Sequence, residues 1–444
     1  AHHSIHDMKS HHATRLGLPV LCAAGVLGNL HAGDLPSTVI EEPAESNPGN
    51  FCDWLSSKPG TLYKNSDNPW FQEFQVFGRF QWQAAYLSAE DVNGYNFSDT
   101  YTEVRRFRLG AKAKFLKYFT VKANVNMVDD ASNNLAPWPG GRKLGWGYEE
   151  FDEALVSFDI KKAFDLGFVD DLDITYGRHK FVLSHEARES SKKLLTVERS
   201  AIANKVYGSY RPTGVTLNGG KGKWDGTLGL FSTDALTRRA GGNIEFLGGW
   251  NDGLAYYASL AYAPCDEWEF RWDFVYNDAD QNQNEDSLFR YSWATSLSAD
   301  YDAGEWGVIV NAIYGDNGDS ANGIRRPERQ GDFWGLVVMP YYWIVEDKLQ
   351  GVVRYQYAGS EEDRGIRINS RYGRRDHGLG VAAETYSGRG NEHHSIYAGL
   401  NYLICGHNLK VQAGLEYEWL NVPGAGLEGD YSALTSWFGF RSYF

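Results

Sequence analysis

Thr435-Ser-Trp-Phe-Gly-Phe-Arg-Ser-Tyr-Phe444 closes the sequence as an alternating aromatic strand. Side chains of a strand alternate between its two faces, so Phe438, Phe440 and Phe444 share one face. Arg441 belongs to the opposite face. In a soluble protein, an uncovered edge strand of this kind would template aggregation. In a closed transmembrane barrel, the same strand pairs with the first strand and turns its aromatic face to lipid.

The period of two recurs through most of the chain. Trp268, Phe270 and Trp272, for example, alternate with Glu269 and Arg271. Connections alternate between short turns and long loops, which is the organisation of an outer-membrane barrel with short periplasmic turns and long extracellular loops. The sequence therefore predicts an all-β fold, a transmembrane antiparallel β-barrel of sixteen strands. The sixteen segments are 69–88, 102–115, 119–130, 150–160, 171–182, 212–219, 223–232, 253–263, 268–278, 290–302, 305–316, 332–343, 348–358, 394–403, 408–419 and 433–444.

Composition agrees with many short strands. The 444 residues are 42% hydrophobic and 15% aromatic, with 49 glycines. The region after the N-terminal leader has no apolar run long enough for a membrane-spanning helix. The formal charge of −14 gives no sign of a basic nucleic-acid-binding domain. We find no catalytic motif and no metal-ligand spacing, so we expect no catalytic residue, no metal and no cofactor.

The N-terminus has the pattern of a signal peptide at 1–32. A positive region with Lys9 and Arg15 precedes the apolar stretch 16–30. Met8 is a plausible start, which would place 1–7 upstream of it. Residues 33–68 are rich in proline and lack periodicity, so we expect a flexible periplasmic segment before a barrel at 69–444. The predicted location is the bacterial outer membrane.

Three cysteines follow this predicted signal peptide: Cys52, Cys265 and Cys405. Their number is odd and their spacing fits no metal site. The sequence leaves two alternatives open, one disulfide that includes Cys52 or three thiols.

The clearest candidate for chemistry is a basic row in 105–115. In a strand, Arg106, Arg108, Lys112 and Lys114 share one face, while the opposite face is apolar. Charge on the lipid side is costly, so the row is expected to face the lumen and to form a track for anions. The alternative is neutralisation by carboxylates of neighbouring strands. Alternation places further cations in the lumen, namely Arg79, Lys122, Arg271, Arg354, Lys410 and Arg441. It also places carboxylates there, including Glu73, Glu269, Asp273, Glu416 and Glu418.

The sequence resembles the phosphate-selective porin O and P family at three places. These are the basic segment 105–114, Thr175-Tyr-Gly-Arg-His-Lys180 with Glu186, and Leu195-Thr-Val-Glu-Arg-Ser200. The resemblance implies sixteen-stranded homotrimers with basic lumen ladders and a constricting third loop. It departs from the family at Val182, where a proline is common, and in its many lumen acids. The aromatic C-terminus also resembles the assembly signal read by the bacterial barrel-assembly machinery, with Phe438, Phe440 and Phe444 as its members.

The third long loop follows the segment 171–182. We expect it to fold inward and to offer hydroxyl and cationic groups to an oxyanion. Its alternative is a short surface helix in water. The candidate constriction residues are Ser190, Ser191, Lys192, Lys193 and Arg199.

The function expected from these patterns is that of an outer-membrane porin for small hydrophilic solutes, with a preference for anions such as phosphate. The anion pathway would consist of Arg79, Arg106, Arg108, Lys112, Lys114 and Lys122. Expected partners are outer-membrane lipid, the solutes, the barrel-assembly machinery and two further copies of the chain, without nucleic acid. The alternatives are a structural or adhesive barrel with a plugged lumen, and a barrel enzyme.

Overall fold

The computed structural model describes residues 50–128, 146–207, 211–233, 250, 253–278, 291–318, 327–367, 372, 388–427 and 429–444. The predicted signal peptide at 1–32, with Met8, lies outside the described residues. So do residues 129–145, 234–249, 279–290, 319–326 and 373–387 of the long connections.

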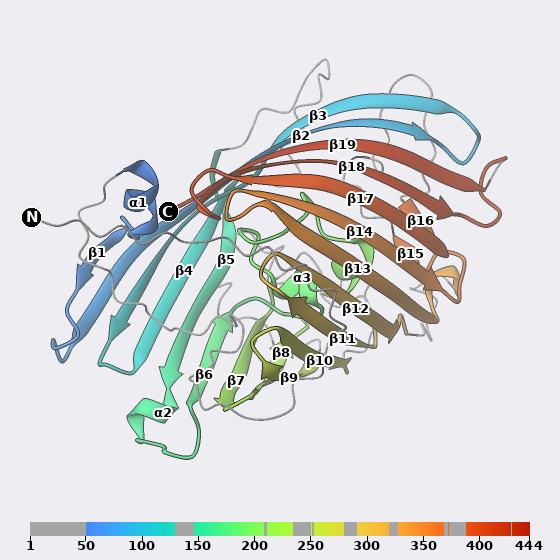
Figure 1. Cartoon of the computed structure of the whole chain (residues 1–444). Coiled ribbons are helices and arrows are strands. Elements are labelled where there is room, and N and C mark those ends of the chain that lie inside the picture. The colour runs from blue at the N-terminus through green and yellow to red at the C-terminus, as the bar shows by residue number, and fades with distance from the viewer. Residues whose placement is uncertain are drawn as a thin grey trace, which may run out of the picture.

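The described strands form a closed antiparallel barrel (Figure 1). Seventeen strands belong to one sheet, and the short β1 (Thr61–Lys64) is added at its edge, which leaves sixteen in the wall. β19 closes the barrel by pairing with β2 from Ser432↔Glu90 to Tyr443↔Arg79. The wall strands are β2 (Phe71–Glu90), β3 (Asn96–Phe115), β4 (Phe119–Val128), β5 (Trp146–Asp159), β6 (Asp171–Arg178), β7 (Thr213–Lys221), β8 (Trp224–Ser232), β9 (Leu254–Cys265), β10 (Trp268–Asn277), β11 (Trp293–Asp302), β12 (Trp306–Asp316), β13 (Asp332–Val345), β14 (Leu349–Ser360), β17 (Glu392–Leu403), β18 (Leu409–Asn421) and β19 (Asp430–Tyr443).

The sixteen predicted segments are thereby confirmed, while their ends differ. The largest difference is at β3, which begins at Asn96 rather than at 102. Its first residues place Asn96, Ser98 and Thr100 on one face and Phe97, Asp99 and Tyr101 on the other. Because Asp99 interrupts the apolar face, the alternation is too weak to predict a strand here.

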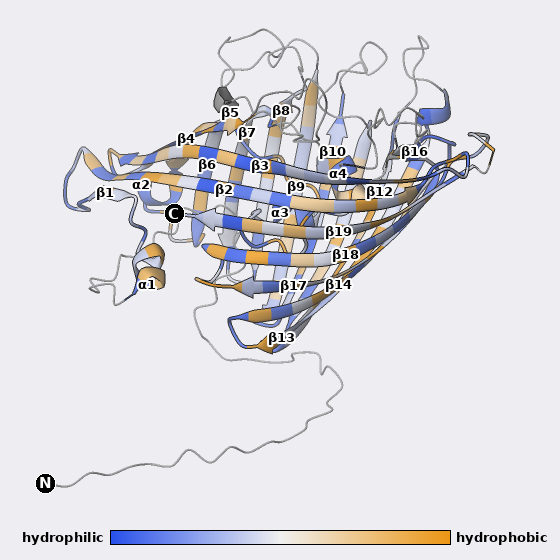
Figure 2. Ribbon diagram, turned by 90° about the horizontal axis from the view of Figure 1, so that it is seen from above, coloured by the Kyte–Doolittle hydropathy of each residue, from blue (hydrophilic) through white to orange (hydrophobic). Residues whose placement is uncertain are grey.

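Each strand presents one polar and one apolar face, and Figure 2 shows the resulting alternation of colour along the strands. On β19, the outward Phe438 is 44% exposed, while the inward Trp437 and Arg441 are 4% and 1% exposed. Aromatic rings meet across the outer face at the seam, where Trp82 and Phe438 lie 6.1 Å apart. The apolar surface of this barrel is therefore outside, as a lipid-embedded wall requires.

The segment before the barrel is partly ordered. α1 (Phe51–Ser56) is capped by Asn50, whose Oδ1 accepts from the backbone N–H groups of Cys52 and Asp53. Cys52 forms a disulfide with Cys405 in the turn between β17 and β18. We expected no regular structure here, because a six-residue helix and a four-residue strand are too short to show a period.

The remaining elements are short. They are α2 (Ile160–Ala163), α3 (His185–Arg188), α4 (Ala201–Tyr207), the 3₁₀ turn η2 (Pro327–Arg329), and a two-stranded sheet of β15 (Ile366–Arg367) and β16 (Arg389–Gly390). Among the described residues, no helix is long and apolar enough to cross a membrane.

Candidate functional site

The basic row of β3 lies on the lumen side of the wall. Arg106 donates from Nη1 to Oε1 of Gln81 at 2.7 Å, and Gln81 is 1% exposed. Arg108, Lys112 and Lys114 follow at intervals that keep them on the same face. The structure therefore brings the four predicted cations together along one strand.

A glycine within this row makes room for an aromatic ring. A Cβ at Gly110 would lie 2.5 Å from the ring of Phe77 on β2, so only glycine fits beneath it. Lys122 of β4 lies over the same ring, with its Nζ 5.8 Å from the ring centroid. Lys122 thus faces the lumen beside the row, in a cation–π geometry.

One further cation of β3 faces the lumen, although alternation along the strand does not predict it. A β-bulge between Arg106 and Val104 leaves Arg105 as an extra residue that opposes no single partner on β2. Its Nε donates to Oε1 of Glu198 in the third loop at 2.7 Å. Because strict alternation assigns Arg105 to the lipid face, no signal in the sequence places it in the lumen.

Two carboxylates of β5 partly neutralise the row. Asp152 binds Arg108 at 2.8 Å and Arg211 at 3.1 Å, and Glu153 binds Lys122 at 2.6 Å. A bulge in the pairing of β4 with β5 makes Asp152 the extra residue, which lets both neighbouring acids face inward. Neutralisation of this kind is the alternative that the sequence left open, although the sequence did not identify these two carboxylates.

Neutralisation is incomplete in the described part of the lumen. There, Arg106, Lys112 and Lys114 have no carboxylate within ion-pair distance. The lining between β2 and β4 therefore keeps a net positive charge.

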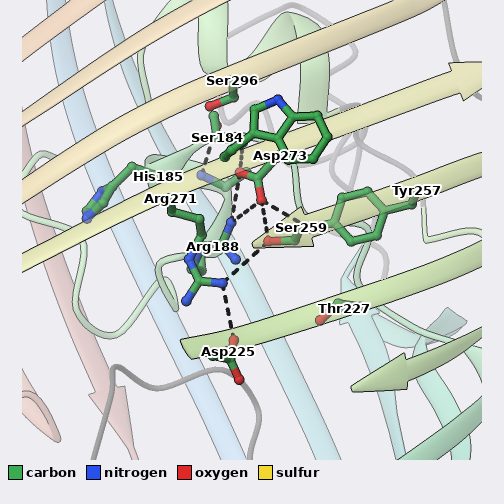
Figure 3. A network of polar contacts seen from close by, with 12 residues as sticks. Ser184, His185, Arg188, Asp225, Thr227, Tyr257, Ser259, Arg271, Asp273 and Ser296 are labelled. Atoms are coloured by element: carbon green, nitrogen blue, oxygen red, sulfur yellow. Dashed lines mark hydrogen bonds and ion pairs between the residues drawn. The ribbon is translucent and has the colours of Figure 1, made fainter. Parts of the chain in front are cut away.

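The third loop follows β6, and its described residues 179–207 enter the barrel and are anchored first on the wall formed by β9 to β12. Arg188 at the end of α3 donates from Nη2 to both oxygens of Asp273 on β10, at 2.6 and 2.8 Å (Figure 3). Asp273 is fully buried and also accepts from Oγ of Ser259 at 2.7 Å. His185 contacts Asp300 of β11 at 3.2 Å. A buried ion pair in which one guanidinium nitrogen donates to both carboxylate oxygens fixes the loop at this wall.

The loop then reaches the wall near the seam. The carbonyl of Leu194 accepts from Nζ of Lys410 at 2.9 Å and from Nε2 of Gln412 at 3.0 Å. Arg441 of β19 donates to the carbonyl of Val197. Lys410 and Arg441 therefore hold the loop instead of lining an open path. Since β10 and β19 are far apart around the barrel, the loop crosses the lumen and narrows it.

The predicted serines stand where the loop meets β2. Oγ of Ser191 accepts from Nη1 of Arg79 at 2.8 Å and from Nε2 of Gln81 at 3.0 Å. The carbonyl of Ser190 accepts from the N–H of Lys193 at 2.8 Å. The structure thus joins Arg79 to Ser191, and Ser190 and Lys193 form a turn within the loop.

Arg199 braces the loop internally. Its Nε donates to the carbonyl of Glu186 at 2.6 Å, and its Nη2 donates to the carbonyl of Glu189 at 3.0 Å. Its guanidinium lies 5.1 Å from the ring centroid of Tyr207. Burial lowers the pKa of Arg199. Its hydrogen bonds to uncharged carbonyl groups do not fully offset the loss of hydration.

Lys192 lies at the loop tip, and the pKa of its ammonium group is clearly lowered. Burial lowers its pKa to about 8, and the positive charges of Arg79, Lys193 and Lys58 act in the same direction. Its Nζ lies 5.3 Å from the ring centroid of Tyr443. The loop tip is therefore a crowded cationic site.

The three aromatic residues of the predicted assembly signal lie apart from the channel. Phe438 and Phe444 are 44% and 46% exposed on the outer face, and Phe440 points the same way. The backbone of Phe444 exchanges two hydrogen bonds of 3.2 Å with Gly78 of β2. The last residue thus belongs to the seam of the barrel.

The described residues contain no group of three or more His, Cys, Asp or Glu side chains that could hold a metal ion. The adjacent histidines are separated by the strand: His393 contacts Glu418 inside at 3.1 Å, and His394 contacts Glu392 outside at 3.0 Å.

Several solved structures share this fold at low sequence identity. A loop-deletion mutant of OmpT, an outer membrane protein of Vibrio cholerae, aligns with a TM-score of 0.53 and 9% identity, over 84% of this chain and 99% of that one. OprB of Pseudomonas putida gives 0.51 and 13%, over 84% and 94%. The anion-selective porin of Comamonas acidovorans gives 0.50 and 11%, over 83% and 99%.

No curated protein sequence matches the chain. Residues 74–308, more than half of the 444, match the family described as phosphate-selective porin O and P. This match agrees with the barrel, the basic row and the inward loop, and it favours a channel over a barrel enzyme. The chain belongs to the phosphate-selective porin O and P family of outer-membrane porins.

Proposed function

We propose that the channel of this porin passes small hydrophilic solutes by diffusion and prefers anions such as phosphate. One observation carries the proposal: Arg106, Arg108, Lys112 and Lys114 line the lumen, and within the part of the chain that the structure describes only Arg108 among them is paired with a carboxylate.

The preference follows from the geometry of this wall. A water-filled lumen between low-dielectric walls focuses the field of its lining charges, so an uncompensated cationic row raises the local concentration of anions. The third loop narrows the lumen beside the row, because its Ser191 is hydrogen-bonded to Arg79, which lies opposite Arg108. Guanidinium groups suit phosphate in particular, since they can donate two parallel hydrogen bonds to its oxygens.

Reversal potentials in planar bilayers test the preference. In a gradient of potassium chloride, the wild-type protein should give a potential of the sign set by chloride. The variant with Arg106→Gln and Lys112→Gln should lower the chloride-over-potassium permeability ratio by about threefold. Lys348→Gln, in an exposed short turn, is the matched control for a lost lysine charge. A wild-type channel in which potassium carries most of the current would disprove the anion preference.

Phosphate recognition needs a separate measurement. Added phosphate should block the chloride current of the wild-type channel, and Arg108→Ala and Lys193→Ala should each weaken that block. A phosphate effect no larger than that of sulfate at equal charge would reduce the proposal to a general preference for anions.

The family resemblance also supports a homotrimer, export by a signal peptide at 1–32 and insertion by the barrel-assembly machinery through the C-terminal strand. The outward placement of Phe438, Phe440 and Phe444 is compatible with that last role. The domain division would then be the leader, the periplasmic segment 33–68 and the barrel 69–444.

A further inference from the structure

The outer face of the barrel is hollowed at the long-loop end of the seam. The hollow has a volume of about 460 Å³, within the range of small-molecule sites. It is lined by Tyr417 and Trp419 of β18, Asp430 and Ser432 of β19, and Glu90 at the end of β2. These five side chains alternate with buried neighbours and lie on the outward face of their strands. The hollow is therefore separate from the channel.

A small residue between two larger ones forms the hollow. Strand pairing places Trp419 opposite Ser432, and Ser432 opposite Glu90. Because the serine side chain is short, the indole and the carboxylate rise on either side of it. Asp430 stands one outward position nearer the long loops. The hollow thus has an aromatic wall, an acidic wall and a hydroxyl group at its floor.

The aromatic wall is held in place from behind. His394 of β17 is paired with Trp419 and stacks on its ring, with centroids 4.6 Å apart and planes at 10°. The imidazole is fixed in turn by the hydroxyl of Tyr355, 2.9 Å from Nδ1, and by the carboxylate of Glu392, 3.0 Å from Nε2. Since His394 covers the indole face toward β17, the other face is turned toward Ser432 and the hollow.

The lining favours a positively charged ligand. The ring of Tyr417 lies 5.7 Å from that of Trp419, and the faces of both ring types attract organic cations. Glu90 and Asp430 are exposed and add two negative charges. Within the part of the chain that the structure describes, no lysine or arginine lines the hollow. Its charge and its aromatic wall therefore suit an ammonium group and oppose an anion.

The surface beside the hollow favours a lipid as the carrier of that ammonium group. Leu434 is paired with Tyr417, and it lies two residues along β19 from Ser432, toward the middle of the membrane. Leu434 and Leu415 are 43% and 53% exposed on the outer face, where acyl chains cover the wall. A headgroup in the hollow would continue directly into chains that lie along these leucines.

We propose that this hollow binds the ammonium headgroup of a lipid in the outer leaflet. The ammonium lies over the free face of Trp419, between Glu90 and Asp430, and the acyl chains run over Leu415 and Leu434. The site is independent of solute passage, so it goes beyond the proposed function.

Native mass spectrometry of the full chain in detergent tests the proposal. The protein is mixed with equal amounts of phosphatidylethanolamine and its N-acetylated form, which has the same acyl chains and no ammonium. The wild type should retain the ethanolamine lipid about fivefold more than the N-acetylated one. Equal retention, or a preference for the N-acetylated lipid, would overturn the proposal. Free ethanolamine at the concentration of the lipid should not displace it, and displacement would show a site for the amine alone.

Two variants assign the binding to this hollow. Glu90→Gln with Asp430→Asn keeps the shape of both side chains, and Trp419→Leu keeps an apolar side chain without the ring. Each should bring the ratio of the two lipids to about one, because each removes one of the two attractions. The band on unheated gels shows whether each variant is folded. If Trp419→Leu does not fold, the double variant decides, and a wild-type ratio in it would contradict the proposal.

A matched control removes two charges at the other end of the barrel. Asp266→Asn with Glu346→Gln alters exposed residues of the turns between β9 and β10 and between β13 and β14. This control should keep the wild-type ratio of the two lipids. A fall equal to that of the double variant in the hollow would show that only the net charge of the protein matters, and the proposed site would be wrong.

Discussion

We expect Lys192 to make the ion selectivity of this channel depend on pH. Burial and the charges of Arg79, Lys193 and Lys58 lower its pKa to about 8. Its ammonium is therefore charged below that value and lost as the pH rises through it. We expect the chloride-over-potassium permeability ratio to fall by about twofold between about pH 6.5 and about pH 9.5. Reversal potentials measured across this range in one bilayer check the change.

The control for this prediction is a variant that cannot titrate at the loop tip. Lys192→Gln should begin with a lower ratio and show a smaller change with pH, while Lys348→Gln should keep the full change. Equal pH dependence in Lys192→Gln and in the wild type would place the titrating group elsewhere.

Gly78 is the residue on which closure of the seam depends most directly. A Cβ there would lie 2.2 Å from Cε1 of Phe444, so Gly78→Ala must displace the terminal ring. We expect a loss of about 1–3 kcal/mol of stability, typical of overpacking, and a smaller folded fraction. The shift of the folded band on unheated gels measures that fraction. Gly351→Ala is the matched control, because a Cβ at Gly351 has its nearest neighbour at 3.5 Å.

At the scale of elements, the segment from α1 to β1 is a strap across the seam. It begins at the disulfide between Cys52 and Cys405, and it ends where β1 pairs with β2 opposite Glu73 to Gln75. β2 extends beyond the last residue of β19, so β1 covers an edge that the seam leaves unpaired. Covering an exposed strand edge guards against unwanted pairing with another chain.

The strap predicts a local effect of the disulfide. In the variant with Cys52→Ser and Cys405→Ser, α1 loses its covalent anchor, and chymotrypsin should cleave after Trp54 in α1 at least about tenfold faster. The barrel strands should remain protected, because their ladder does not depend on the strap. Mass spectrometry of timed digests measures the rate. Cys265→Ser, which leaves the disulfide intact, should digest like the wild type, and equal cleavage in all three proteins would show that β1 alone fixes the strap.

At the scale of the whole molecule, the wall could be predicted from the sequence because its signal is local. Period-two alternation over about ten residues marks each strand and its lipid face. The row from Arg106 to Lys114 faces the lumen for that reason. The inward turn of Arg105 could not be predicted, because a bulge breaks the alternation at that residue.

The interior was harder to predict, because its contacts join residues far apart in the sequence. Arg354 has the parity of a channel cation, yet it is fully buried between Glu186 of the loop and Glu416 of β18, at 3.0 and 2.9 Å. Only the path of the third loop decides whether such a cation meets solvent or a carbonyl.

The outer wall leads to a last prediction, on assembly. Small residues pair across β3, β4 and β5 on the outer face, where Ala111 lies opposite Ala123 and Ala123 opposite Ala154. Small side chains allow close approach of two membrane-embedded surfaces, so we expect this patch to lie in the interface of the proposed trimer. Ala123→Trp should therefore reduce the trimer fraction in mild detergent, as measured by light scattering. Ala398→Trp adds the same ring on the exposed outer face of β17 and should leave the trimer intact. If Ala398→Trp dissociates the trimer while Ala123→Trp does not, the interface lies on the other side of the seam, since the two strands flank it on opposite sides.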